Sequence, residues 1–148
     1  MKQKNIVVLT VFSLLLSCGC NKSQPAARIT MAEGSLSVKN RSVVNIFPIV
    51  KTTREEDCGV VSAGAGATVG FASIDADKSA RVIWAEKEFD EPKRTVVFPL
   101  KITEETSKQT KHLEFLYKGN GVWLLNLYNV SPPGKSKPLV SLSGEVEK

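Results

Sequence analysis

The chain has 148 residues, of which 20 are basic and 15 acidic, so the net charge is +5 at pH 7. The charges of both signs are interspersed, which argues against the basic patch of a nucleic-acid-binding protein. Three cysteines exclude a disulfide scaffold, and the single histidine has no Cys/His partner at metal-ligand spacing. We therefore predict one domain with no nucleic-acid partner, no cofactor and no metal.

The first 20 residues, MKQKNIVVLTVFSLLLSCGC, are the most informative stretch. Lys2 and Lys4 precede an apolar run over residues 6–16, and small residues follow it. This is the layout of a secretory signal peptide. The apolar run is too short for a transmembrane helix, which needs about 20 apolar residues.

The end of this stretch resembles the lipobox of bacterial lipoproteins. The sequence LLSC ending at Cys18 places a bulky apolar residue at position −3 and a small residue at −1, and SCGC ending at Cys20 fits a looser version. The resemblance implies that residues 1–17 are a signal peptide that is removed. It also implies that Cys18, or alternatively Cys20, is lipidated with a diacylglycerol. Two or three acyl chains give a stable membrane anchor.

In such lipoproteins an aspartate after the lipidated cysteine favours retention at the inner membrane. Here that position holds Gly19 or, for the alternative cysteine, Asn21. The resemblance therefore implies a lipid anchor in the bacterial outer membrane, with the protein facing the periplasm and an envelope protein as partner. In the alternative, an ordinary secreted protein, Cys18 and Cys20 are simply cysteines near the cleavage site.

The mature chain is expected to divide into two parts. Residues 18–27 hold the lipidated cysteine and a short polar tether, and residues 28–148 form the folded domain. Loss of the signal peptide lowers the net charge to about +3. We expect Cys58, the one cysteine of the domain, to be a free thiol, with a disulfide to Cys20 as the alternative.

From residue 28 onward, short runs of β-branched and aromatic residues alternate with turn clusters, and a helical period of 3.6 is absent. This pattern predicts an all-β domain, a single antiparallel β-sandwich of about 7–8 strands that is immunoglobulin-like or related. The predicted strands are 29–31, 36–38, 43–53, 67–74, 81–85, 95–102, 112–118, 122–130 and 139–146.

Local signals refine several of these segments. Pro48 cannot donate a ladder hydrogen bond, so it predicts an edge strand or a bulge within 43–53. Residues 54–57 predict a charged loop, and 103–111 predict a polar loop with at most one helical turn. Gly119-Asn120-Gly121 is the clearest hairpin signal, because these residues tolerate the positive φ of tight turns.

The segments VKNRSVVNIFPIV, GVVSAGAGATVGF and ARVIWAE, within residues 38–86, resemble a pattern in small uncharacterised bacterial lipoproteins. In that pattern an asparagine turn and a long strand precede a glycine-rich turn, and a strand ending in tryptophan follows. The resemblance implies a β-sandwich lipoprotein and brings no activity with it.

The aromatic residues divide into two groups. We expect Trp84 and Trp123 to fill the space between two sheets, since each buries on the order of 200 Å². Tyr117 and Tyr128 carry hydroxyl groups and are expected to reach the surface, where they are candidate ligand-facing aromatics. His112 is expected at a strand end or on the surface rather than as a catalytic base or metal ligand.

One segment has the partial pattern of a calcium loop. Asp75, Asp77, Ser79 and Glu86 match positions 1, 3, 5 and 12, but Ala80 replaces the glycine needed at the sharp bend. We expect the two aspartates to be turn residues.

The function predicted is a non-enzymatic binding or assembly module at the envelope. The alternatives are a small hydrolase, which needs His112 or a carboxylate pair beside a pocket, and a glycan-binding module with exposed aromatics.

Overall fold

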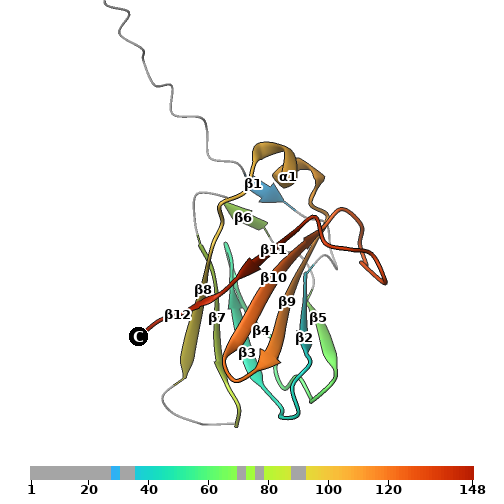
Figure 1. Ribbon diagram of the computed structural model, residues 1–148. Helices are drawn as coiled ribbons and strands as arrows, with labels where there is room; N and C mark the ends of the chain where they lie inside the picture. Colours follow the sequence, from blue (N-terminus) through green and yellow to red (C-terminus); the bar gives the residue numbers. More distant parts are fainter. Residues whose placement is uncertain (1–27, 31–35, 70–72, 76–78, 88–92) are drawn as a thin grey trace, which may run out of the picture.

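The structure is a computed structural model that describes residues 28–30, 36–69, 73–75, 79–87 and 93–148. Two five-stranded sheets pack face to face, and a short two-stranded sheet and one helix lie at one end (Figure 1). The predicted all-β sandwich is therefore confirmed, with 54% of the described residues in strands and 6% in helix.

The first sheet has the strand order β11-β10-β9-β2-β5, and we call it the β9 sheet. Its neighbours are antiparallel except for β2 and β9, which pair in parallel. Its strands are β2 (Leu36–Asn40), β5 (Gly66–Val69), β9 (His112–Gly119), β10 (Val122–Tyr128) and β11 (Val140–Ser143).

The second sheet, the β7 sheet, is antiparallel throughout and has the order β12-β8-β7-β3-β4. Its strands are β3 (Phe47–Lys51), β4 (Glu55–Asp57), β7 (Ser79–Ala85), β8 (Arg94–Pro99) and β12 (Glu145–Val146). The two-stranded sheet joins β1 (Arg28–Thr30) and β6 (Ser73–Asp75).

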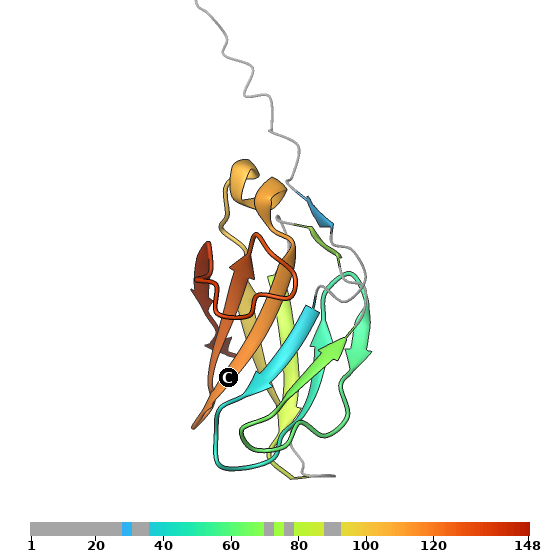
Figure 2. The same cartoon turned by 90° about the vertical axis from the view of Figure 1, so that its right-hand side faces the viewer.

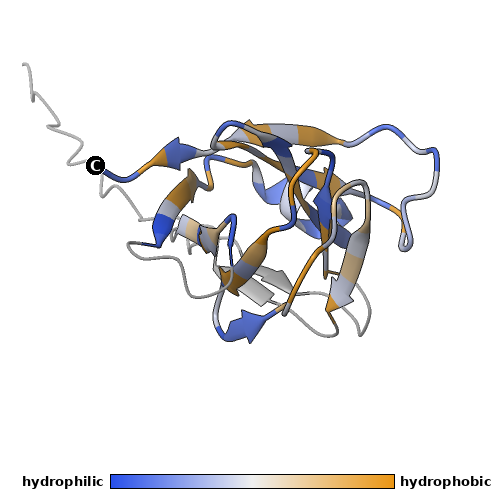
Figure 3. Ribbon diagram, turned by 90° about the horizontal axis from the view of Figure 1, so that it is seen from below, coloured by the Kyte–Doolittle hydropathy of each residue, from blue (hydrophilic) through white to orange (hydrophobic). Residues whose placement is uncertain are grey.

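Alternating side chains from both sheets form one core. Seen from below in Figure 3, hydrophobic and more polar bands alternate along the strands, as expected when one face of each sheet is buried. Trp84, Tyr117 and Trp123 are 0–1% exposed, and their ring centroids lie 4.8–5.9 Å apart. The rings of Phe98 and Phe115 meet edge to face at 5.6 Å. Both tryptophans are in the core as predicted.

The hairpin between β9 and β10 also forms as predicted. Asn120 and Gly121 have φ values of 53° and 77°, which suit the tight two-residue turn that joins the strands. The polar loop after β8 contains one short helix, α1 (Glu104–Gln109), whose first turn is capped by Thr103. Within the described ranges, no helix combines the length and apolar character needed to span a membrane.

Three predictions for residues 43–57 are wrong. Pro48 lies in β3, which is an inner strand between β7 and β4. Its carbonyl accepts a hydrogen bond from Cys58 N just beyond the end of the β4 ladder. At that position the ladder needs no N–H donor from residue 48, so a proline is tolerated. The expected charged loop at 54–57 contains β4, which pairs with β3 as the edge of the β7 sheet. The long segment 43–53 forms a strand only over Phe47–Lys51.

The expected last strand, 139–146, divides into two strands that belong to different sheets. β11 pairs with β10, and β12 pairs with β8, so the chain crosses between the layers at Gly144. A Cβ added at Gly144 would overlap Val96 Cγ2 and lie 2.9 Å from Phe98 Cε1. The crossing therefore requires a residue without a side chain.

We predict that Gly144→Ala lowers the free energy of unfolding by about 1–3 kcal/mol, because the added methyl group meets two buried core side chains. Denaturant unfolding followed by tryptophan fluorescence measures this change. Ser143→Ala, at the exposed neighbouring position, serves as the control and should shift stability by less than about 0.5 kcal/mol. Equal stability of the two variants would contradict the close packing at Gly144.

Candidate functional site

The outer face of the β9 sheet carries a buried polar network. Along β9, Leu113, Phe115 and Tyr117 belong to the core, so the alternation of the strand places His112 and Glu114 on the other face. Both are nevertheless only 2% exposed. The loop after β10 lies in front of the upper part of this sheet (Figure 2), and its Pro133 is buried.

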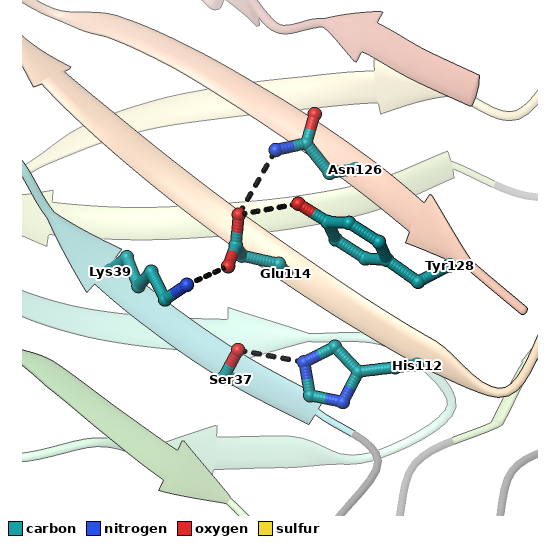
Figure 4. Close-up of polar contacts among 6 residues, drawn as sticks. All are labelled: Ser37, Lys39, His112, Glu114, Asn126 and Tyr128. Carbon is teal, nitrogen blue, oxygen red and sulfur yellow. Dashed lines mark hydrogen bonds and ion pairs between the residues drawn. The ribbon is translucent and has the colours of Figure 1, made fainter. Parts of the chain in front are cut away.

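Six side chains form this outer-face network, and β2, β9 and β10 each contribute two of them (Figure 4). Parallel pairing of β2 with β9, and antiparallel pairing of β9 with β10, bring the three strands into register. The members are Ser37, Lys39, His112, Glu114, Asn126 and Tyr128.

The Glu114 carboxylate is the centre of the network. Its Oε2 atom forms an ion pair with Lys39 Nζ at 2.6 Å. Its Oε1 atom accepts hydrogen bonds from Asn126 Nδ2 at 3.1 Å and from the Tyr128 hydroxyl at 3.2 Å. Ser141 Oγ in turn donates to Asn126 Oδ1 at 2.6 Å, which fixes the orientation of the amide. The buried charge is therefore neutralised and hydrogen-bonded.

These contacts keep Glu114 ionised. Burial alone would raise the pKa of the carboxyl group, but hydrogen bonds from Lys39, Asn126 and Tyr128 outweigh it and lower the pKa below its ordinary value. Burial and the neighbouring carboxylate raise the pKa of Tyr128, so its hydroxyl stays protonated and donates.

Ser37 and His112 form a second contact within the network. Ser37 Oγ lies 2.9 Å from His112 Nε2, and Nδ1 of the same ring has no hydrogen-bond partner in the described part of the chain. In Figure 4 this second nitrogen points away from Glu114. Burial lowers the pKa of His112, Lys39 adds to this effect and Glu114 opposes it, so the imidazole is neutral at pH 7.

A pocket of about 240 Å³ lies where this contact meets the edge of the sheet. One wall comes from β2 and β5, another from the first residue of β9, and the third from the loop after β10. The lining residues are Ser37, Lys39, Gly66, Ala67, Thr68, His112, Pro132, Pro133 and Gly134.

The Ser37–His112 contact resembles a nucleophile and its base, but the arrangement is poorly suited to catalysis. In the described part of the chain no carboxylate orients His112 through Nδ1, which has no hydrogen-bond partner, and Glu114 instead pairs with Lys39, Asn126 and Tyr128. Ser37 also lies in β2, which is paired on both sides, so the backbone amides around it serve the sheet ladders. The pocket is better suited to binding than to stabilising an oxyanion intermediate.

The other residues singled out in the sequence lie in different places. Cys18 and Cys20 are outside the described residues. Contrary to expectation, Tyr117 is 0% exposed, because its hydroxyl donates to Glu86 Oε1 at 2.6 Å beneath the β9–β10 turn. Tyr128 is 7% exposed for a similar reason, since Glu114 accepts from its hydroxyl. Trp84, Tyr117, Trp123 and Tyr128 thus form no exposed aromatic platform.

His112 begins β9, so it lies at a strand end, which is one of its two expected positions, and it is buried rather than on the surface. Cys58 is a free thiol whose pKa is raised to about 11 by burial and by the charges of Asp57 and Glu56, which makes it a poor nucleophile. Among the described residues no group of three or more His, Cys, Asp or Glu side chains is placed to hold a metal ion.

The sequence analysis did not single out Ser37, Lys39, Glu114 or Asn126 as site residues. A usable signal existed for two of them. Glu114 and Asn126 are polar residues inside otherwise apolar strands, and the predicted hairpin turn places them opposite each other. No comparable signal connects Ser37 and Lys39 to them, because the β2–β9 pairing joins segments far apart in the chain.

Comparison with known proteins adds no relative. No family model, curated protein or solved structure gave a significant match to the chain. The outer-face network and its pocket therefore carry the functional argument.

We predict that Glu114→Gln lowers the free energy of unfolding at pH 7 by about 2 kcal/mol, because it removes a charged hydrogen-bond acceptor from the network. The folded pKa of Glu114 is lowered, so its stabilisation is present above the unfolded pKa and is lost as the pH falls through the folded pKa. The difference between the native chain and the variant should therefore shrink below about pH 4. Urea unfolding from pH 7 to pH 3 measures it.

Glu55→Gln provides the matched control. Glu55 is 57% exposed and forms an ion pair with Lys51, so its loss should cost less than about 1 kcal/mol. Two results would show that Glu114 does not stabilise the fold through its charge. One is a loss in the free energy of unfolding for Glu114→Gln that is no larger than the loss for Glu55→Gln. The other is a loss for Glu114→Gln that does not change with pH.

Proposed function

We propose that the chain is a lipid-anchored protein of a bacterial cell envelope whose β-sandwich binds a ligand without catalysing a reaction. The anchor is Cys18, with Cys20 as the alternative, and the protein is held at the outer membrane facing the periplasm. The lipobox-like end of residues 1–20 supports this location, because an acylated cysteine replaces a membrane-spanning helix as the anchor.

The observation that carries the binding role is the pocket at the edge of the outer-face network. A free outer face of a sandwich needs no buried carboxylate, yet here Glu114 is withdrawn from water and held by three partners. Buried polar groups that are fully hydrogen-bonded make a site rigid. The network thus holds Lys39 and the neighbouring Ser37–His112 pair in fixed positions beside the pocket.

A small hydrolase is the second candidate function. The observation that favours it is the 2.9 Å contact between Ser37 Oγ and His112 Nε2 inside a pocket. The observation against it is the unoriented Nδ1 of His112, since a general base of this kind is normally held by a third group. This missing third group favours a binding role over hydrolysis.

For the anchor, we predict that the mature N-terminus begins at Cys18 and carries two or three acyl chains. Intact-mass and peptide mass spectrometry of the protein extracted from membranes should show this modification. Cys18→Ser should release the protein from the membrane fraction, whereas Cys20→Ser should leave it anchored. The opposite pattern would assign the lipid to Cys20, and membrane release by neither variant would contradict a lipid anchor.

For binding, we predict that a photoreactive residue at Thr68 forms a specific adduct in the native envelope. Thr68 is exposed and lines the pocket, so a bound ligand or partner lies within reach. Mass spectrometry after irradiation measures the adduct. A photoreactive residue at Glu55, exposed on the other sheet, is the control and should give none.

Two results would contradict this function. Equal crosslinking from positions 68 and 55 would mean that the pocket is not a binding site. Labelling of the native chain by a fluorophosphonate, absent from Ser37→Ala, would show an activated serine and favour the hydrolase.

A further inference from the structure

The polar groups that line the pocket all donate hydrogen bonds. They are the ammonium of Lys39, the hydroxyls of Ser37 and Thr68, and the imidazole of His112. No aspartate or glutamate is among the lining residues, and Lys39 is the one lining side chain with a fixed charge. Such a lining matches a ligand group that accepts hydrogen bonds and carries negative charge.

Lys39 has N–H donors that the ion pair with Glu114 does not use. Its ammonium group forms an ion pair with Glu114 Oε2, which occupies at most one of its N–H groups, and its side chain is 39% exposed, whereas Glu114 is 2% exposed. An ammonium group has three N–H donors, so two are left for water or a ligand. The carboxylate thus holds the lysine in place from beneath without facing the pocket itself.

The Ser37–His112 pair also has an unpaired hydrogen-bond donor, whichever tautomer the imidazole adopts. If Ser37 donates to Nε2, the proton of the neutral ring is on Nδ1, which has no partner. If Nε2 carries the proton and donates to Ser37 Oγ, the serine hydroxyl proton is free instead. In either tautomer one donor beside the pocket lacks an acceptor within the described ranges, and a buried donor without an acceptor lowers stability.

We propose that this pocket binds an oxyanion, the carboxylate or phosphate group of a small ligand, through Lys39, Ser37 and His112. The inference rests on the binding role proposed above and specifies the chemical class of the ligand. A pocket of about 240 Å³ is smaller than the pockets of about 300–1,000 Å³ that enclose drug-sized ligands. It therefore accommodates the charged end of a ligand rather than a whole large molecule.

Protonation of His112 strengthens such a site. The imidazolium has two N–H donors and a positive charge, so it adds both a hydrogen bond and an attraction for the anion. Among the described residues, the titratable groups that face His112 are Lys39 on β2, Glu114 on its own strand and Tyr128 on β10. The lining residues of the loop, Pro132, Pro133 and Gly134, carry no charge. Binding of an anion should therefore be accompanied by uptake of a proton.

The test is an NMR titration of the mature full chain with sodium acetate and with inorganic phosphate, with glucose as a neutral probe. Both anions should shift the amide signals of pocket residues, with dissociation constants on the order of millimolar. Affinity should rise about tenfold between pH 7.5 and pH 5.5, because one proton is taken up. The tighter anion identifies the ligand group as carboxylate or phosphate.

Matched variants separate the pocket from general charge effects. Lys39→Gln and Ser37→Ala should each weaken anion binding by about tenfold, the loss of one charged or buried hydrogen bond. Lys51→Gln removes the same charge from the other sheet and should leave binding unchanged. Ser37→Ala keeps the Lys39–Glu114 ion pair, so it remains informative if Lys39→Gln does not fold.

Two results would overturn the oxyanion assignment. The first is anion-induced shifts that are unaffected by Lys39→Gln and Ser37→Ala, which would mean weak binding to surface lysines. The second is glucose binding at the pocket as tightly as either anion. A specific adduct at position 68 together with either result would leave the binding role intact and reject only the ligand class.

Discussion

The parallel pairing of β2 with β9 is the contact on which the site depends. It aligns residues 36–40 with residues 113–117 and so brings Ser37 to His112 and Lys39 to Glu114. All other pairings in the two main sheets are antiparallel. A shift of one residue in this register would turn the polar side chains of β2 into the core and its apolar ones outward. The hydrophobic pattern of the strand therefore fixes the geometry of the pocket.

The buried carboxylate of Glu114 links the stability of the fold to the proposed binding site. Replacing a buried ion pair with apolar residues is often neutral or stabilising, so such a pair is not needed for folding alone. Here the pair orients Lys39, and the amide and hydroxyl of Asn126 and Tyr128 satisfy the remaining lone pairs. The neighbouring Ser37–His112 pair has one donor without an acceptor among the described residues. This combination is typical of a surface arranged for a ligand rather than for packing.

Local signals in the sequence predicted the all-β class, the hairpin between β9 and β10, and the burial of the two tryptophans. The same hairpin turn, centred on Asn120 and Gly121, implies that Glu114 faces Asn126, so two of the six network residues could have been inferred. The rest depends on long-range contacts. Nothing local relates β2 to β9, or shows that the loop after β10 covers polar side chains. Tyr117 was misplaced because its hydroxyl finds Glu86, a partner 31 residues away.

The crossing at Gly144 has a consequence for how the molecule assembles. The last strands, β11 and β12, add to the edges of both layers, so the C-terminal segment joins the two sheets. Neither layer has its full set of strands until residues 140–146 are in place. Removing residues 140–146 would therefore leave both layers one edge strand short at the same time.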